Sequence, residues 1–535
     1  MTTKTKGWLG WAAVLVLFSP VVSAQLSHNM SIGNPVSLAM GNSATAYIEG
    51  PDAIHYNPAA LGLVNEKHEQ FKLQMAFFQY EGEISGRAPG ESYDPFDNPD
   101  FRQDPLLEGE VSRPIEVESP SVFLPFFGHV SLPFFAAPGY GFALRTERGN
   151  AVFANSAFAV QVFGYERDED NIAAFNGQRF GITRIAYFNP AVGLELGENL
   201  YGGASIGFSW QGLGFTSKIR SALNTIAQID NLLDNLPGIN DVLELNLNPY
   251  NHVGTLEAEV EDPLSVTFTL GLLWQPEPWL SLGFAYQSEG RAHMKGEFSI
   301  EYTDSFNELM NTLQPADGLL TLLDGAAITG LQRQSGDVTV DYTQPQWASV
   351  GASVLVTPRL RVNLDVKWVD YSVVEELRFE YDRNLDYLVL SSVVNYLSPQ
   401  VGGDYADPDE LRLPRDYQAV VDWSLGVEYA YTDRLKLRAG YEPRSSSIPD
   451  DRQDLLIPIG EADLYTLGFG YALKEQSRVD VGFGYLITRL DIAPGESRIA
   501  NSTIEGDVVY NPYRGLHIEH QLESFILAMT YSTAF

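Results

Sequence analysis

The chain has 535 residues, no cysteine and a formal net charge of −35 at neutral pH. The acidic balance excludes nucleic acid as an expected partner, because proteins that bind nucleic acid carry basic surfaces. The lack of cysteine excludes disulfides, and a closed ladder of strand hydrogen bonds is another way to hold an exported chain together.

The first residues predict export. Lys4 and Lys6 precede an apolar run from Trp8 to Phe18, and Val22-Ser23-Ala24 resembles a signal-peptide cleavage site. The run is too short for a membrane helix, and no later segment is a long uncharged apolar stretch. We therefore expect a signal peptide at residues 1–24 and a mature chain that starts near Gln25.

Residues 25–68 have no strong strand pattern and are rich in small residues and turn formers. They include the stretch Asp52-Ala-Ile-His-Tyr-Asn57-Pro58-Ala59-Ala60. We interpret this segment as an irregular N-terminal domain.

From Phe71 onward, apolar and polar residues alternate, as in strands with one apolar face and one polar, solvent-facing face. The clearest example is Trp279–Tyr302, where Leu280 to Ile300 form an apolar face and Arg291, His293 and Lys295 share the polar one. Strands are predicted at Phe71–Ile84, Val122–Phe134, Gly139–Phe163, Phe180–Leu196, Leu200–Phe215, Gly254–Trp274, Trp279–Tyr302, Trp347–Val356, Leu360–Phe379, Trp423–Tyr431, Leu435–Tyr441, Leu464–Leu473, Val479–Leu490 and Gln521–Phe535.

This prediction counts Gly139–Phe163 as one strand despite the interruption at Arg148-Gly149-Asn150, which gives about fourteen strands, the even number that an up-and-down barrel needs. Short turns alternate with long loops, among them Glu91–Pro120 and Tyr387–Pro414, and this alternation is typical of outer-membrane barrels. A large soluble antiparallel sheet is the alternative, but it has no reason to segregate its loops by length. We therefore predict an all-β, membrane-spanning antiparallel barrel at residues 69–535.

Two segments have helical spacing of apolar residues instead. Ile219–Leu236 is one, and Ser305 to about Leu331, which Pro315 breaks, is the other. We expect them to lie in outer loops at about 217–250 and 303–334.

In this order the motifs resemble the FadL/TodX family of outer-membrane transporters for long-chain fatty acids and other hydrophobic compounds. The motifs are Asp52 to Ala60, Leu270-Gly-Leu-Leu-Trp-Gln-Pro with Leu282-Gly-Phe-Ala-Tyr-Gln-Ser, Asn363-Leu-Asp-Val-Lys-Trp-Val-Asp-Tyr-Ser372, Ser424-Leu-Gly-Val-Glu-Tyr, Leu437-Arg-Ala-Gly-Tyr and Ile448-Pro-Asp450. The resemblance implies that residues 25–68 form a hatch inside the lumen, with Asp52, Asn57, Pro58 and Ala59 as its motif. It also implies an outer groove, an inner pocket, a hatch movement and a sideways exit at a kink in the third strand.

These expectations give candidate site residues, each with a plain structural alternative. Ile226, Leu233, Phe306 and Met310 offer an apolar landing site on the two helices, unless the helices only cap the barrel. Arg291, His293 and Lys295 are predicted to point inward and to receive a carboxylate, unless they form a salt-bridge ladder with Glu289 and Glu297. Gly139, Gly141 and Gly149 are candidates for the kink, or ordinary barrel glycines, and the Asn57-Pro58 motif is alternatively a structural turn alone.

We expect no enzyme, metal or cofactor. In His517-Ile-Glu-His520 the strand spacing places the two rings on opposite faces, and neither a nucleophile elbow nor a phosphate-binding loop is present. The predicted function is passive uptake of hydrophobic molecules, first of all long-chain fatty acids, by a monomer in contact with lipid in the outer membrane of a Gram-negative bacterium. The alternative is a FadL-like barrel that serves as a scaffold or shuttle in secretion or in outer-membrane assembly.

Overall fold

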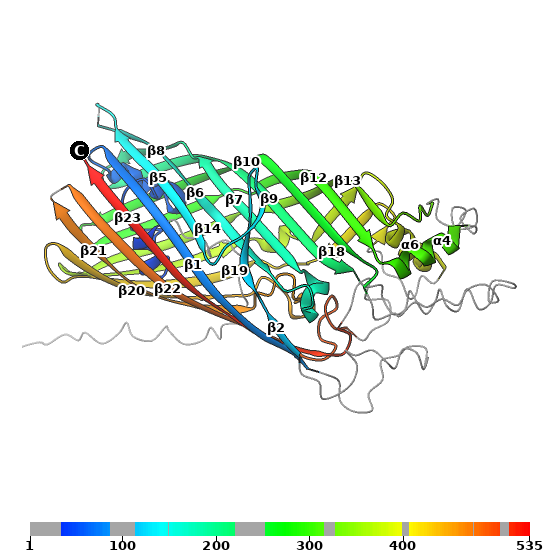
Figure 1. Cartoon of the computed structure of the whole chain (residues 1–535). Coiled ribbons are helices and arrows are strands. Elements are labelled where there is room, and N and C mark those ends of the chain that lie inside the picture. The colour runs from blue at the N-terminus through cyan, green and yellow to red at the C-terminus, as the bar shows by residue number, and fades with distance from the viewer. Residues whose placement is uncertain are drawn as a thin grey trace, which may run out of the picture.

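The computed structural model describes residues 34–85, 113–147, 149–219, 252–314, 327–397, 406–474, 476–502 and 513–535. In it the chain is a closed antiparallel barrel of 14 strands, as predicted (Figure 1). The predicted signal peptide and the first predicted helix, with Ile226 and Leu233, lie outside the described residues. In the part of the chain that is described, no helix is both long enough and apolar enough to cross a membrane.

The wall strands follow one another in chain order, and several are divided by a bulge or a short break. They are β1 (His68–Ser85), β5 (Phe135–Arg145), β6 (Ala151–Glu166), β7 with β8 (Arg179–Phe188, Ala191–Gly197), β9 (Leu200–Ile219), β10 (Gly254–Glu277), β11 with β12 (Leu280–Gln287, Gly290–Tyr302), β13 with β14 (Arg333–Gln344, Trp347–Thr357), β15 with β16 (Leu360–Val369, Glu376–Tyr381), β18 with β19 (Glu410–Pro414, Val420–Ala430), β20 (Leu435–Arg444), β21 (Glu461–Lys474), β22 (Ser477–Ile492) and β23 (His517–Ala534). The last strand pairs with β1 along the full length of β1 and closes the barrel. Short turns join the strands at the end that holds the C-terminus, so this end faces the periplasm (Figure 1).

The remaining elements are short. Before β1 come α1 (Pro35–Ala39), α2 (Ala53–Tyr56) and the 3-10 helix η1 (Pro58–Leu63); the others are β2 (Arg113–Glu116), β3 (Ser119–Leu124), β4 (Gly128–Ser131), η3 (Ile172–Asn176), α4 (Asp304–Leu313), η5 (Tyr371–Val373), α6 (Asp386–Leu397), β17 (Ala406–Asp407) and η6 (Asp450–Arg452).

Two strand predictions were wrong, and their errors cancelled in the count. Val122–Phe134 is not a wall strand, because β3 and β4 form a hairpin whose tip takes positive φ at Phe126 and Gly128. Gly139–Phe163 is two strands, β5 and β6, since Gly149 adopts a φ of +76° and turns the chain back between them.

The helix predicted from Ser305 with a break at Pro315 is α4, which ends at Leu313, and residues 315–326 of its predicted continuation lie outside the described residues. Two other boundaries differ from the prediction. The predicted loop Tyr387–Pro414 contains α6, whose apolar side chains Leu388 and Val389 are buried. The strand β13 precedes the predicted start at Trp347, where the glycine and acidic residues of Arg333–Gln344 obscured the alternation.

The apolar face of the wall changes sides along the barrel. In the periplasmic half of β10, Leu264, Val266, Phe268, Leu270, Leu272 and Trp274 are 45–54% exposed on the outer surface. Ten residues at ~3.4 Å each, tilted by roughly 40°, span about 26 Å, which is the height of a lipid-facing band. These side chains therefore mark the part of the wall that meets hydrocarbon.

In the outer half the order is reversed. On β10 the side chains of Leu256, Ala258 and Val260 are buried inside, while the glutamates between them lie on the outer surface. The bulge between Asp262 and Ser265 causes this exchange, because one extra residue turns every later side chain to the other face. The inner apolar side chains of this half, with those of α4 and α6, form one buried cluster that we call the upper core.

Candidate functional site

Residues 34–64 cross the lumen. The helix α1 packs against β21 and β22, whereas η1 packs against β8, β9 and β10, and these two groups of strands are about half a circumference apart in the strand order. The wall makes room for the crossing chain with glycines: a Cβ on Gly203 would lie 2.2 Å from the Pro58 carbonyl carbon, and one on Gly271 would lie 2.1 Å from Asn57 Oδ1. We call residues 34–64 the inner segment.

A buried carboxylate ties the inner segment to the wall. Asp52 is fully buried and forms an ion pair with Lys72 of β1. Its other oxygen accepts hydrogen bonds from Asn34 Nδ2 at 2.8 Å and from Gln70 Nε2 at 3.1 Å. Removing one partner of such a pair leaves an uncompensated buried charge, so this contact holds the segment firmly.

Asn57 sits at the junction of α2 and η1. Its Oδ1 accepts a hydrogen bond from the backbone N–H of Ala59, and Pro58 begins η1, so the Asn-Pro-Ala motif caps a turn of helix. Its Nδ2 donates to the carbonyls of Thr45 and Leu272, at 2.7 and 3.0 Å. One side chain thus joins two parts of the inner segment to β10.

A second row of polar groups lies between the inner segment and the upper core. Arg184 of β7 pairs across the sheet with Gln161 of β6 on one side and with Gln211 of β9 on the other. Arg184 is only 2% exposed and Gln211 is fully buried. The row points into the lumen, because Ile182 and Leu213, two residues along the same strands, belong to the upper core.

Arg184 is a buried cation without a described counterion. Its Nη2 donates to Thr267 Oγ1 at 3.2 Å, and its Nε has no partner. Among the residues that the structure describes, no carboxylate contacts it, and both amide atoms of Gln211 are also unpaired. A buried charge with no carboxylate partner among the described residues is costly, so this row suits an anionic ligand group.

His55 of the inner segment stays neutral beside this row. Burial lowers the pKa of His55 well below its usual value, and the charges of Lys72 and Arg184 lower it further. Since Asp52 already neutralises Lys72, the positive charge that remains belongs to Arg184.

An apolar cavity borders the polar row on its outer side. Its lining includes Gln161, Phe180, Ile182, Leu213 and Tyr342. The enclosed space is about 20 Å³, room for roughly one water molecule. A larger ligand therefore enters only if side chains of the upper core move apart.

The wall has a break beside this region. Strand β5 pairs with β1 only from His68 to Ala76 and with β6 only as far as Ala157. Above these points β1 and β6 continue with no described ladder between them, until β2 joins β1 at Glu81. The aromatic pair Phe77–Phe134, with centroids 5.1 Å apart, lies at the lower edge of this break.

The β3–β4 hairpin covers the wall next to the break, on its outer face. Gly164, Gly181 and Gly214 are cross-strand partners on β6, β7 and β9, and they form a row of positions without side chains. Ser121 and His129 of the hairpin lie against this row, and a Cβ on Gly214 would come within 2.0 Å of His129 Nε2. The hairpin is therefore seated in a groove that the glycines provide.

Both α4 and α6 lie at the outer end of the barrel (Figure 1), and side chains of both belong to the upper core. Phe306 and Met310 of α4 are 1% exposed, and the Phe306 ring stacks on Tyr302 at 4.9 Å between centroids. Both residues belong to the upper core, so they lie over the outer mouth of the lumen rather than on a free surface.

The match to a known family extends over almost the whole chain. Residues 14–535 match the description of the outer membrane protein transport family OMPP1/FadL/TodX. The chain belongs to the OMPP1/FadL/TodX family. It is accordingly an outer-membrane protein, and the family handles hydrophobic compounds.

Individual relatives of this family member are distant. A long-chain fatty acid transport protein of Escherichia coli O6:H1 (strain CFT073) is 23% identical over 297 residues, 54% of this chain and 58% of that protein, so the chain matches little more than half the length of this relative. A FadL homologue from Pseudomonas aeruginosa has a TM-score of 0.66 at 14% identity and covers 96% of this chain and 100% of its own. The toluene transporter TodX of P. putida has a TM-score of 0.56 at 15% identity, covering 93% and 97%. At these identities the structures show a shared fold and no more.

The inward orientation predicted for Arg291, His293 and Lys295 is wrong. All three side chains are exposed on the outer surface of β12, while Ala292 and Met294 between them are buried inside. The break between β11 and β12 shifts the alternation, so the apolar face that meets lipid on β11 continues on β12 as the face toward the lumen. His293 Nδ1 lies 2.5 Å from Asp341 Oδ1 on the neighbouring strand.

The three glycines that were candidates for the kink do not lie in the third wall strand, β6. A Cβ on Gly139 would meet Lys72 of β1, whereas one on Gly141 would meet Pro51, so Gly141 faces the inner segment from β5. Gly149 lies in the β5–β6 turn and has nothing within 4 Å of a Cβ. The irregularity of the third wall strand is a bulge in β6 between Ala159 and Gln161, which no glycine marks.

Sequence reasoning missed Arg184. The signal was an arginine within the apolar alternation Phe180, Ile182, Ala186, together with a glutamine in each neighbouring strand. Reading it required the register of three strands, which only the structure supplies.

Proposed function

We propose that the protein mediates passive, energy-independent uptake of long-chain fatty acids across the outer membrane. The family and the barrel support a channel for hydrophobic compounds. The names of the relatives point to two ligand classes, fatty acids and toluene, so the class must be argued from the site. We also propose that the protein works as a channel and not as an enzyme.

The observation that favours a fatty acid is Arg184. An uncharged hydrocarbon leaves the Arg184 guanidinium and the Gln211 amide unsatisfied, whereas a carboxylate accepts charge-assisted hydrogen bonds from both. The acyl chain would then extend into the upper core, where the cavity lined by Phe180 and Leu213 begins. This arrangement suits a long apolar molecule with one anionic end.

The inner segment serves as the plug in this proposal. It fills the lumen below the polar row and is fixed by Asp52 and Asn57, so a bound molecule does not pass straight to the periplasm without its displacement. The break between β1 and β6 offers a second way out, into the membrane, at the height of the cavity.

The test compares oleate with oleyl alcohol, which has the same chain without the charge. In purified protein in a nonionic detergent, Arg184→Gln should weaken oleate binding about tenfold or more, since charge-assisted hydrogen bonds each contribute ~1.5–3 kcal/mol. Binding of oleyl alcohol should stay unchanged, and Arg184→Lys should restore part of the oleate affinity.

The matched control is the double variant Arg291→Gln/Lys295→Gln. It removes two cations on the outer surface and should affect neither ligand. Equal losses for oleate and oleyl alcohol in Arg184→Gln, or a loss of oleate binding in the control alone, would contradict the assignment of a carboxylate to Arg184.

A further inference from the structure

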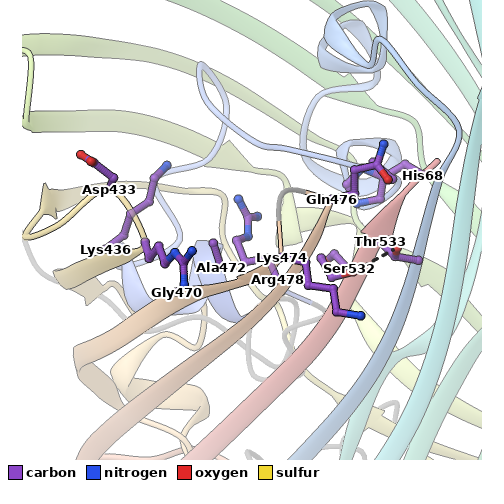
Figure 2. Close-up of a pocket in the computed structure, with 13 residues that line it drawn as sticks. His68, Asp433, Lys436, Gly470, Ala472, Lys474, Gln476, Arg478, Ser532 and Thr533 are labelled. Atoms are coloured by element: carbon purple, nitrogen blue, oxygen red, sulfur yellow. Dashed lines mark hydrogen bonds between the residues drawn. The ribbon is translucent and has the colours of Figure 1, made fainter.

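A basic cavity opens at the periplasmic end of the lumen. It measures about 290 Å³ and lies between the ends of β1 and β20–β23 (Figure 2). Arg434, Lys436, Lys474 and Arg478 line it, and Asp433 is the one carboxylate side chain among its described lining residues. The positive charge of this cavity is opposite in sign to the net charge of −35 on the whole chain.

Part of this charge is already balanced by a chain of ion pairs. The chain has three acids and three bases, joined in the order Glu49–Arg478 (2.5 Å), Arg478–Asp480 (2.5 Å), Asp480–Arg438 (2.8 Å), Arg438–Glu428 (2.8 Å) and Glu428–Lys436 (3.1 Å). Arg434 and Lys474 stand outside it. Both are exposed, and neither has a carboxylate partner among the described residues.

The rest of the lining consists largely of hydrogen-bond donors. Ser477, Ser532 and Thr533 contribute hydroxyls, and Gln476 contributes an amide. Two cations without an ion-pair partner among the described residues, beside several donors and the single carboxylate of Asp433, form a surface that recognises a carboxylate or a phosphate. We infer that the periplasmic mouth binds an anionic head group, and that the bound group competes with Glu49 of the inner segment for Arg478.

Glu49 provides the link to the plug. It belongs to the inner segment, and its other oxygen accepts a hydrogen bond from Tyr47 at 2.7 Å. Arg478 belongs to the wall and borders the cavity. A second anion next to Arg478 therefore weakens the contact that holds residues 47–49 against β22.

The binding test uses the full-length protein that carries Arg184→Gln, so that binding at Arg184 does not contribute. The result can then be interpreted even if the proposed function at Arg184 is wrong. Octanoate probes a carboxylate that leaves the channel, and inorganic phosphate probes the head group of a phospholipid. By calorimetry we expect one of them to bind, and Arg434→Gln/Lys474→Gln should weaken this binding roughly tenfold or more. The charge-preserving pair Arg434→Lys/Lys474→Arg should retain it.

The matched control is Arg359→Gln, which removes an exposed cation from another periplasmic turn that does not border the cavity. Binding of octanoate alone would identify the carboxylate source, and binding of phosphate would identify the lipid head group. No binding of either at millimolar concentration, or equal binding in the cavity variant and the control, would overturn the site.

The competition with Glu49 is tested by a single cysteine, since the natural chain has none. Ile48 is 3% exposed, so a thiol in Ile48→Cys reacts with a maleimide only when residues 47–49 leave the wall. Saturating anion should raise the labelling rate severalfold, and Glu49→Gln should raise it without anion. Saturable binding with an unchanged labelling rate would refute the competition.

Discussion

Substitutions of Arg184 and Arg415 compare how much a buried charge costs in stability with and without a carboxylate partner. Both guanidinium groups are 2% exposed. Arg415 Nη1 donates to Asp454 Oδ2 at 2.6 Å, whereas no described carboxylate contacts Arg184. If Arg184 is kept for a ligand, its replacement by an apolar residue of similar length should stabilise the empty protein.

The expected magnitude follows from these contacts. Arg184→Met loses one neutral acceptor, about 1 kcal/mol, and removes a buried charge whose desolvation costs several kcal/mol, so we expect a gain of roughly 1–3 kcal/mol. Arg415→Met leaves Asp454 buried without its partner and should lose about 3–5 kcal/mol. The two substitutions should thus differ in sign.

Unfolding of the barrel by guanidinium chloride in lipid vesicles measures this difference, with the tryptophans of the barrel as fluorescent probes. Saturating oleate should then raise the stability of the unmodified protein by about 2.7 kcal/mol at a hundred times its dissociation constant, and that of Arg184→Met by much less. A loss of stability in Arg184→Met comparable to that in Arg415→Met would refute the reasoning, because it would show that Arg184 is a structural residue.

Three further predictions concern the hairpin and the inner segment. Gly214→Ala places a methyl group against His129, so it should loosen the β3–β4 hairpin and speed chymotrypsin cleavage at the exposed Phe126, whereas Gly197→Ala, with open space around it, should not. Asp52→Asn leaves Lys72 buried without a counterion, so it should destabilise the docked inner segment by about 3–5 kcal/mol. Single-channel conductance should rise as a result. The control Glu69→Gln removes the more exposed ion pair with Lys67 and should leave the conductance unchanged. Burial works to raise the pKa of Glu49, but Arg478 and Lys436 outweigh it and hold the pKa well below its usual 4.5. The Glu49 contact is therefore fully present above pH 4.5 and is lost only as the pH falls through the lowered pKa. The rate of maleimide labelling of Ile48→Cys, divided by the rate for a free thiol at the same pH, should stay low from pH 7 to 4.5.

The alternation of side chains was enough to predict a barrel, but not which face of each strand meets lipid. On β11 the apolar side chains Leu282 and Phe284 are exposed outside, and on β12 the apolar Met294 and Phe298 are buried inside. In the sequence the two strands form one alternating run. At Ser288–Glu289 the apolar side chains pass from the outer face to the inner face, and at the same point the outside of the wall changes from lipid to water, so the alternation itself is not interrupted. Arg291 and Lys295 were consequently assigned to the wrong side.

The candidate site was predictable in kind and not in position. A cation for a carboxylate was expected from the ligand class, yet Arg184, which we propose for this role, stands out only when Gln161 and Gln211 are known to flank it. The Asn57-Pro58 turn was readable because capping depends on residues next to each other in the chain. Contacts between strands distant in sequence, such as those of Asp52 with Lys72, carry no local signal.

The exchange of apolar faces has a consequence for where a lipophilic molecule resides. On β10, the 8 residues from Gly254 to Glu261 lie beyond the lipid-facing band, which places that part of the barrel about 20 Å into the hydrated zone above the bilayer. There the outer face of the wall is charged and its inner face is apolar, so in the proposed function this part of the barrel would keep a bound fatty acid out of water. The break between β1 and β6 opens just above Ala76, where this part of the barrel meets the hydrocarbon. In the proposed function, a fatty acid that leaves at this break does not pass the part of the lumen that residues 34–64 cross.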